Sequence, residues 1–356
     1  MLVIRPIAIE DLEPLHGLAA LTGYGLTTLP RDTKLLRRRI RASIRGFEKL
    51  TDDDRPRGET YLFVLEDLPT GRLVGTSGIV AKVGGFDPFY AYRIETSVHE
   101  SKMLNVRKEI QVLHLVEEHD GPCEVGSLFV APEIRRGGAG RLLSLCRFLL
   151  MAQFPEYFDP VVIAEMRGVV DEHGHSPLWD ALGRHFFDID YPTADYLSMV
   201  NKRFIADLMP KHPIYIPLLP VDAQAVIGQV HEQTEPAMKM LQDEGFRRCG
   251  LVDIFEGGPV VRCALNEVRS VKESVLAPVA EITEGPIESG PYVLSNGRQD
   301  FRACEGPLQA SEAGVRIKMQ HAMALRVRVG DMVRYVTPRP HRAKQEAADG
   351  SEVSLY

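Results

Sequence analysis

The sequence of 356 residues predicts an α+β protein, in which a large domain of strands and helices is followed by a small β-rich domain. Two observations favour this class. Up to about residue 260, apolar strand-like runs and amphipathic helical segments follow one another along the chain. Beyond Pro259 the pattern changes to short strand-like runs separated by Gly-Pro turns. We therefore expect domains at 1–260 and 261–338, a helical insertion at about 168–230, and a polar, disordered tail at 339–356.

The N-terminal region predicts one strand and two helices. Residues 2–5 form a short apolar strand, and apolar residues then recur at nearly helical spacing from Ile9 to Leu18. A second amphipathic helix is expected over 33–47. One side of it is rich in arginine, and we expect that side to face solvent.

The middle of the chain predicts a hairpin and then a strand–helix–strand unit. Residues 86–115 mix aromatic, charged and β-branched types, which indicates further strands without defining their bounds. The expected elements are strands at 61–65, 73–80, 125–130 and 161–166, and a helix that ends near Phe154.

The remaining chain predicts helical pieces first and strands later. Residues 171–227 have the character of an insertion that contains short helices. A helix at 234–244 is closed by Gly245. Strands are expected at 251–255, 292–294, 315–318 and 332–336.

Composition disfavours several classes of protein. A formal net charge of −7 argues against a non-specific nucleic-acid binder. No apolar run approaches the length of a membrane span, and we expect no signal peptide. The five cysteines are odd in number and lack C-x-x-C spacing, which favours reduced thiols over a disulfide framework or a zinc site. We therefore expect a cytoplasmic protein without a metal site or a nucleic-acid or membrane partner.

The most informative segment runs over 128–143, where a strand and a proline precede Arg135-x-x-Gly138-x-Gly140 at the start of a helix. Glycines let the backbone approach a ligand closely. The first amide groups of a helix lack intrahelical partners and point outward at the positive end of its dipole. Such a turn suits a pyrophosphate. Three arginines add positive charge around it, namely Arg135, Arg136 and Arg141.

This order of features resembles the acyl-CoA-binding motif of the GNAT superfamily of N-acyltransferases. The resemblance implies a GNAT-type acyltransferase fold, with a central mixed, mostly antiparallel sheet flanked by helices. A dinucleotide-binding loop fits less well, because its fingerprint is G-x-G-x-x-G with an acidic residue on the next strand. A P-loop would need Lys-Ser or Lys-Thr. The segment could also be a plain tight turn before a helix, and this alternative stays open.

Residues 237–246 resemble the later helix of that superfamily, which flanks the pantetheine arm of the cofactor. Where the superfamily often places a tyrosine as general acid for the thiol, this sequence has Leu241. His231, at the entrance to the same helix, is the candidate to replace it. An imidazole with a pKa of about 6.5 can exchange protons near neutrality. A structural role is equally open to any single histidine.

Several longer blocks resemble the arginine N-succinyltransferase family, including 22–30 (TGYGLTTLP), 164–168 (AEMRG) and 252–259 (VDIFEGGP). The similarity covers about residues 1–262. It implies transfer of succinyl from succinyl-CoA to the α-amino group of L-arginine, the first step of an arginine catabolic route, without a permanently bound cofactor. The resemblance also implies that Leu128 contacts succinyl-CoA and that His231 is the proton donor. We expect the strand edge from Leu128 to Val130 to hold the pantetheine arm by main-chain hydrogen bonds.

Some positions depart from the family pattern, and they leave the acceptor open. Phe89 and Ala91 stand where the family has Trp and Asn. The chain could therefore use ornithine or another amine as acceptor, use acetyl-CoA as donor, or be a non-catalytic acyl-CoA-binding subunit of a hetero-oligomer. A homodimer or a hetero-oligomer with a related chain is expected by resemblance. Candidate cations for the substrate carboxylates, each equally consistent with a surface ion pair, are Arg93, Arg167 and Arg184.

Overall fold

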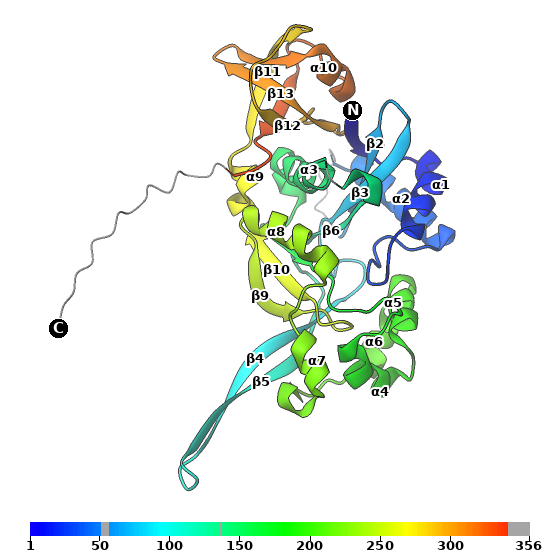
Figure 1. Cartoon of the computed structure of the whole chain (residues 1–356), viewed down its shortest axis with the longest axis vertical. Coiled ribbons are helices and arrows are strands. Elements are labelled where there is room, and N and C mark those ends of the chain that lie inside the picture. The colour runs from blue at the N-terminus through cyan, green and yellow to red at the C-terminus, as the bar shows by residue number, and fades with distance from the viewer. Residues whose placement is uncertain (51–56, 136, 341–356) are drawn as a thin grey trace, which may run out of the picture.

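The computed structural model describes residues 1–50, 57–135 and 137–340, which form an elongated body (Figure 1). One continuous sheet joins the described strands in the order β12-β15-β11-β14-β13-β1-β2-β3-β6-β7-β10-β9-β4-β5-β8. Antiparallel neighbours prevail, and the parallel pairs among these strands are β6–β7 and β11–β14. The predicted α+β class with a mixed, mostly antiparallel sheet is confirmed. From residue 341 onward, the predicted tail lies outside the described residues.

The N-terminal elements agree with their predicted positions. β1 (Leu2–Pro6) leads into α1 (Leu12–Ala20), and α2 (Thr33–Glu48) follows a loop. α2 begins at Asp32, whose side chain accepts hydrogen bonds from the backbone N–H groups of Lys34 and Leu35.

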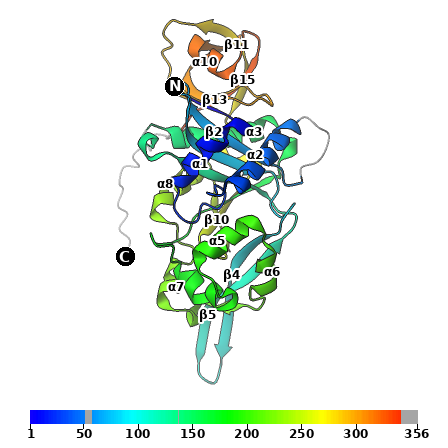
Figure 2. The same ribbon diagram turned by 90° about the vertical axis from the view of Figure 1, so that its right-hand side faces the viewer.

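Helices cover both faces of the central strands β2 (Thr60–Asp67), β3 (Arg72–Val80) and β6 (Cys123–Val130). Successive side chains of β2 point to opposite faces of the sheet, and the two sets pack against different helices. Leu62 and Val64 pack in one cluster with α1 and α2, whereas Phe63 and Leu65 pack in another with α3 (Ala139–Gln153). Figure 2 shows α1 and α2 together in front of these strands.

The stretch that the sequence left undefined forms a long hairpin. β4 (Phe89–Ser101) and β5 (Val106–Glu118) pair without interruption along their whole lengths. The outer half of this hairpin projects from the body (Figure 1). Near its base, β5 also pairs with the short strand β8 (Ile214–Tyr215).

The insertion packs around a second hydrophobic core, which it shares with the base of the β4–β5 hairpin and the end of β9. Trp179, which is fully buried, lies at its centre beside Phe187 and Phe255. Its short helices are α4 (Arg184–Phe187), α5 (Tyr191–Val200), α6 (Arg203–Leu208) and α7 (Val221–Val226). Among the helices that the structure describes, none combines the length and apolar character needed to cross a bilayer.

The chain then returns to the main sheet. α8 (Glu235–Asp243) precedes β9 (Arg247–Val252) and β10 (Pro259–Ala264), and β7 (Val161–Glu165) pairs with β10. The sequence predicted β9 at 251–255, but the strand lies earlier in the chain, at Arg247–Val252. It ends at Val252 because the Asp253 carboxylate accepts hydrogen bonds from the N–H groups of Phe255 and Glu256, which turns the backbone.

The C-terminal part continues the same sheet. Val3 of β1 pairs with Cys304, so the two parts share backbone hydrogen bonding. The boundary expected at residue 260 falls inside β10, whose partners are β7 and β9. The later elements are α9 (Arg269–Lys272), β11 (Val275–Thr283), β12 (Pro291–Ser295), β13 (Ala303–Ser311), β14 (Gly314–Lys318), α10 (Met319–Leu325) and β15 (Met332–Val336).

Candidate functional site

The central feature of the site is a separation of two parallel strands. β6 and β7 pair only at Cys123 with Val162 and at Glu124 with Ile163. β6 then continues beside β3, and β7 continues beside β10. Within the described chain, the edge of β6 that faces β7 is therefore unpaired over 128–130. Unpaired strand edges can bind an extended ligand through main-chain hydrogen bonds.

A bulge in β6 accounts for the separation. Ser127 has a positive φ of 54°, and the register between β3 and β6 shifts between Thr76 and Gly78. A bulge bends its strand and increases the local twist. The bend falls between the paired Glu124 and the unpaired edge.

The glycine loop lies at the end of this edge. Gly138 is the residue before α3 and has a φ of 82°, a conformation that residues with a Cβ rarely adopt. A Cβ at Gly140 would lie 3.9 Å from Val130 Cγ2 and 3.8 Å from Met240 Cε. The structure thus brings together the loop, the end of β6 and α8, as the sequence motif requires.

The arginines around the loop have other partners. Arg135 Nε donates to the carbonyl oxygen of Val130 at 3.1 Å, and its guanidinium lies 5.8 Å from the Phe129 ring centroid. Arg141 pairs with Asp243 of α8 at 3.3 Å. Arg136 lies outside the described residues. In this structure, the two described arginines are thus already engaged by groups of the chain itself.

His231 lies on the β7 side of the separation. Its backbone N–H donates to the carbonyl oxygen of Arg167 at 2.9 Å, just beyond the end of β7. Its Nδ1 accepts a hydrogen bond from the N–H of Gln233 at 3.1 Å, which leaves Nε2 as the nitrogen that carries the proton in the neutral ring. Partial burial and the positive charge of Arg167 lower the pKa of His231. The ring is therefore neutral at pH 7.

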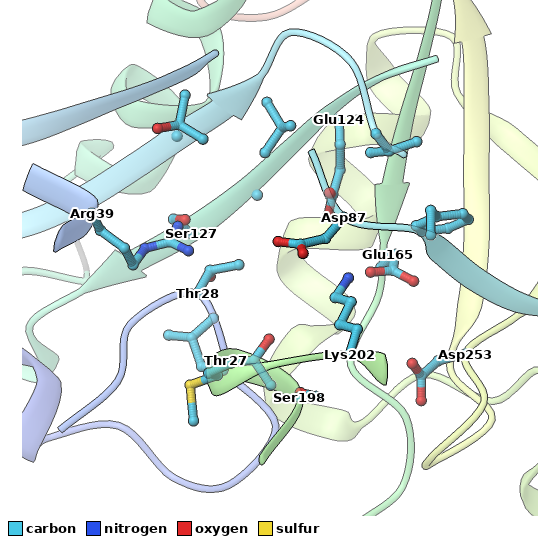
Figure 3. Close-up of a pocket in the computed structure, with 18 of the residues that line it drawn as sticks. Thr27, Thr28, Arg39, Asp87, Glu124, Ser127, Glu165, Ser198, Lys202 and Asp253 are labelled. Atoms are coloured by element: carbon cyan, nitrogen blue, oxygen red, sulfur yellow. The ribbon is translucent and has the colours of Figure 1, made fainter. Parts of the chain in front are cut away.

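A cavity of about 370 Å³ adjoins the same separation (Figure 3). Its wall is built from the start of β6, the end of β7, α2, the α5–α6 junction and the loop after β9. Positively and negatively charged side chains both line the cavity. Among its lining residues are Arg39, Glu124, Glu165, Arg167, Asp195, Lys202, Asp253 and Glu256.

Five carboxyl groups of this cavity have raised pKa values, those of Glu124, Glu165, Asp195, Asp253 and Glu256. Burial, together with the negative charges of Glu124 and Asp253, raises the pKa of Glu165 well above its ordinary value. Burial and Asp253 raise the pKa of Glu256 to about 8. Burial and Asp253 also raise the pKa of Asp195 to about 7. Carboxyl groups crowded in this way favour a bound cation.

Sequence reasoning missed most of this cavity. We expected the arginine-rich side of α2 to face solvent, and that was wrong for Arg39, which turns toward the cavity. Of the three candidate cations, Arg167 lines the cavity, whereas Arg93 lies near Glu95 at 3.9 Å and Arg184 near Asp180 at 3.8 Å. The blocks AEMRG and VDIFEGGP contain Glu165, Asp253 and Glu256, but their spacing gave no sign that these residues meet.

A sheet that opens between two parallel strands, with a glycine loop starting a helix at the opening, defines the GNAT-type acyltransferase fold. The chain matches the family model "Arginine N-succinyltransferase beta subunit" over residues 2–270 and the model of that subunit's C-terminal domain over 275–337.

Curated relatives agree with this match. Arginine N-succinyltransferases from Salmonella schwarzengrund and Salmonella paratyphi B are each 44% identical over 339 residues, which is 94% of this chain and 97% of theirs. A solved structure, arginine/ornithine succinyltransferase subunit AI from Pseudomonas aeruginosa, has a TM-score of 0.87 and 38% identity. The match covers 96% of this chain and 99% of that one. The chain belongs to the arginine N-succinyltransferase family.

Proposed function

We propose that this chain transfers the succinyl group of succinyl-CoA to the α-amino group of L-arginine, giving N2-succinyl-L-arginine and coenzyme A. The observation that carries this proposal is the opening between β6 and β7. It adjoins the glycine loop at the start of α3 and also the charged cavity. The names of the relatives support the choice of substrates.

The acyl-CoA is proposed to lie along the unpaired edge of β6. Main-chain groups of Leu128 and Val130 would hold the pantetheine arm, and a backbone N–H there would polarise the thioester carbonyl. Amide groups at the start of α3, from Gly138 onward, would hold the diphosphate, with Gly140 allowing close approach. Arg135 and Arg141 would add charge after leaving their present partners, and Arg136 is proposed from its place in the loop.

His231 is proposed to carry one proton through the reaction. The acceptor amine must lose a proton as its nitrogen bonds to the thioester carbon, and the thiolate must gain one as the carbon–sulfur bond breaks. The neutral imidazole can accept the first proton at Nδ1, in place of the hydrogen bond from the Gln233 N–H, and then deliver the proton on Nε2 to sulfur. The lowered pKa of His231 suits this order, because the ring begins the cycle neutral.

The test is turnover by the purified chain alone, with succinyl-CoA and L-arginine, followed by mass detection of succinylarginine. We expect a product about 100 mass units heavier than arginine together with one equivalent of free thiol, from the formula of a succinyl group. Absence of both would refute the proposal.

Two relatives favour a second candidate worth testing in the same assay. The names "beta subunit" and "subunit AI" indicate enzymes of more than one chain, and the name of the solved structure also mentions ornithine. A non-catalytic, acyl-CoA-binding subunit would bind succinyl-CoA but release no thiol without a related chain. Parallel reactions with L-ornithine in place of arginine, and with acetyl-CoA in place of succinyl-CoA, test the choice of acceptor and donor. A cytoplasmic location and a homodimer remain predictions.

A further inference from the structure

One wall of the cavity carries an excess of negative charge. Glu124 lies at the start of β6, Glu165 at the end of β7, and Asp253 directly after β9. These strands belong to one sheet, and their carboxylates face a common space (Figure 3). Like charges this close repel one another, which is why Glu124 and Asp253 raise the pKa of Glu165.

One cation of the chain lies among these three carboxylates. Burial raises the pKa of Glu124, Glu165 and Asp253, and the charge of Lys202, at the junction of α5 and α6, acts against that rise. Over the described residues, Lys202 forms no ion pair within 4.0 Å. Three carboxyl groups surround one ammonium group, so the wall can carry more negative charge than Lys202 balances once a bound cation lowers their raised pKa values. A second cation would be attracted to this wall.

The opposite side of the cavity holds an unsatisfied cation. Arg39 extends from α2 toward Ser127, across the cavity from Glu165 and Asp253 (Figure 3), and its charge acts against the raised pKa of Glu124. Its Nε is fully buried and has no hydrogen-bond partner among the described residues, and the same holds for Thr28 Oγ1. A buried donor without a partner destabilises the protein. A buried guanidinium nitrogen left without a partner at a cavity indicates that a ligand acceptor belongs there.

We propose that this cavity is the acceptor site, with Glu124, Glu165 and Asp253 binding the cationic side-chain end of the amino acid, and Arg39 binding a substrate carboxylate. This inference rests on the proposed function and adds its specificity determinants. A guanidinium has five donors in a planar fork and can contact two carboxylates at once. The carboxylate at Arg39 is either the α-carboxylate of the amino acid or the free carboxylate of the succinyl group.

Citrulline provides the sharpest probe of the acidic wall. It has nearly the shape of arginine, but an uncharged ureido group replaces the guanidinium. We expect the protein as purified to favour arginine over citrulline by about 100-fold or more in kcat/KM, because charged hydrogen bonds are lost. In Glu165→Gln, arginine should lose about 10- to 100-fold in kcat/KM while citrulline changes little. The KM for succinyl-CoA should stay the same.

The matched control is Glu312→Gln, which makes the same change at an exposed turn between β13 and β14. It should leave the arginine-to-citrulline ratio unchanged. If Glu165→Gln lowers both substrates equally, or neither, the assignment of the acidic wall is wrong. Calorimetric titration with arginine separates this failure from failure of the proposed function. Arginine binding that is lost in Glu165→Gln supports the wall even without turnover, and no arginine binding at all overturns both.

Arg39→Gln tests the other side with two analogues. Agmatine is arginine without its α-carboxylate, and butyryl-CoA is the analogue of succinyl-CoA without its free carboxylate. If Arg39 binds the amino acid, the variant loses the preference for arginine over agmatine. If it binds the acyl group, the variant loses the preference for succinyl-CoA over butyryl-CoA. Retention of both preferences would overturn the role of Arg39.

Discussion

The hydroxyl of Tyr191 donates a hydrogen bond to Glu256 Oε2 at 2.6 Å, and the other oxygen of that carboxyl group accepts the N–H of Gly168 at 3.1 Å. Tyr191 begins α5 of the insertion, Glu256 lies in the loop between β9 and β10, and Gly168 follows β7. One buried carboxyl group therefore joins the insertion to the two strands beside the cavity. Its protonation state affects both stability and the shape of the acceptor site.

Stability should fall as the pH rises from about 5 to 9. The pKa of Glu256 is raised from 4.5 to about 8, so the folded state keeps a proton that the unfolded chain has released. The stabilisation is complete below the unfolded pKa and is lost as the pH rises through the folded pKa. Asp195, with a pKa of about 7, acts in the same direction. Calorimetry should show a lower Tm at pH 9 than at pH 6.

The variant Glu256→Gln keeps the shape of this side chain but cannot ionise. It should flatten the dependence of Tm on pH over the same range. An unchanged slope in the variant would exclude Glu256 as the titrating group.

The buried ion pair between Glu244 and Arg269 should contribute strongly to stability. The two side chains are 2.6 Å apart and buried, and Glu244 also accepts the N–H of Ser270 at 2.8 Å. Arg269→Met leaves the carboxylate buried without its partner, which typically costs about 3–5 kcal/mol. Urea unfolding would measure it. The exposed pair of Lys272 and Glu267 on the same segment provides the control, and Lys272→Met should cost less than about 1 kcal/mol. Equal losses would contradict this account.

Gly138→Val should weaken acyl-CoA binding. The positive φ of Gly138 suits no β-branched residue, so the loop must change conformation and its amides move away from the diphosphate. We expect the KM for succinyl-CoA to rise about tenfold or more, equivalent to about 1.4 kcal/mol. Gly137→Val is the matched control, because a Cβ there meets no atom within 4 Å. A similar KM in both variants would show that the diphosphate binds elsewhere.

His231→Asn should lower kcat without a comparable change in either KM. Loss of a positioned proton carrier costs about 10²- to 10⁴-fold. In the unmodified chain, kcat/KM should fall at acidic pH with a pKa below 6.5, because the ring must begin neutral. This limb should disappear in the variant. His212→Asn, at an exposed loop position, should keep both rate and pH profile. Nearly normal turnover in His231→Asn would remove this residue from the mechanism.

Local patterns predicted most elements of the fold. Leu62 to Leu65 alternate between two faces, and the helix of 139–153 follows a glycine turn, so both are evident within a short window. Prediction was poorer where distant contacts decide. The outer half of the hairpin at 89–118 projects from the body, and side-chain hydrogen bonds of Asp253 set the end of β9. Neither feature has a periodic signal.

The sequence by itself determined the glycine loop, its helix and the family, because these depend on residues that are close together in the chain. Only the tertiary structure decided which charged groups share the cavity. Glu124, Glu165 and Asp253 are far apart in sequence, and Arg39 lies on a helix whose other arginines are exposed. Strand pairing and the bulge at Ser127 bring these groups to one opening, and pairing across such distances leaves no trace in local spacing.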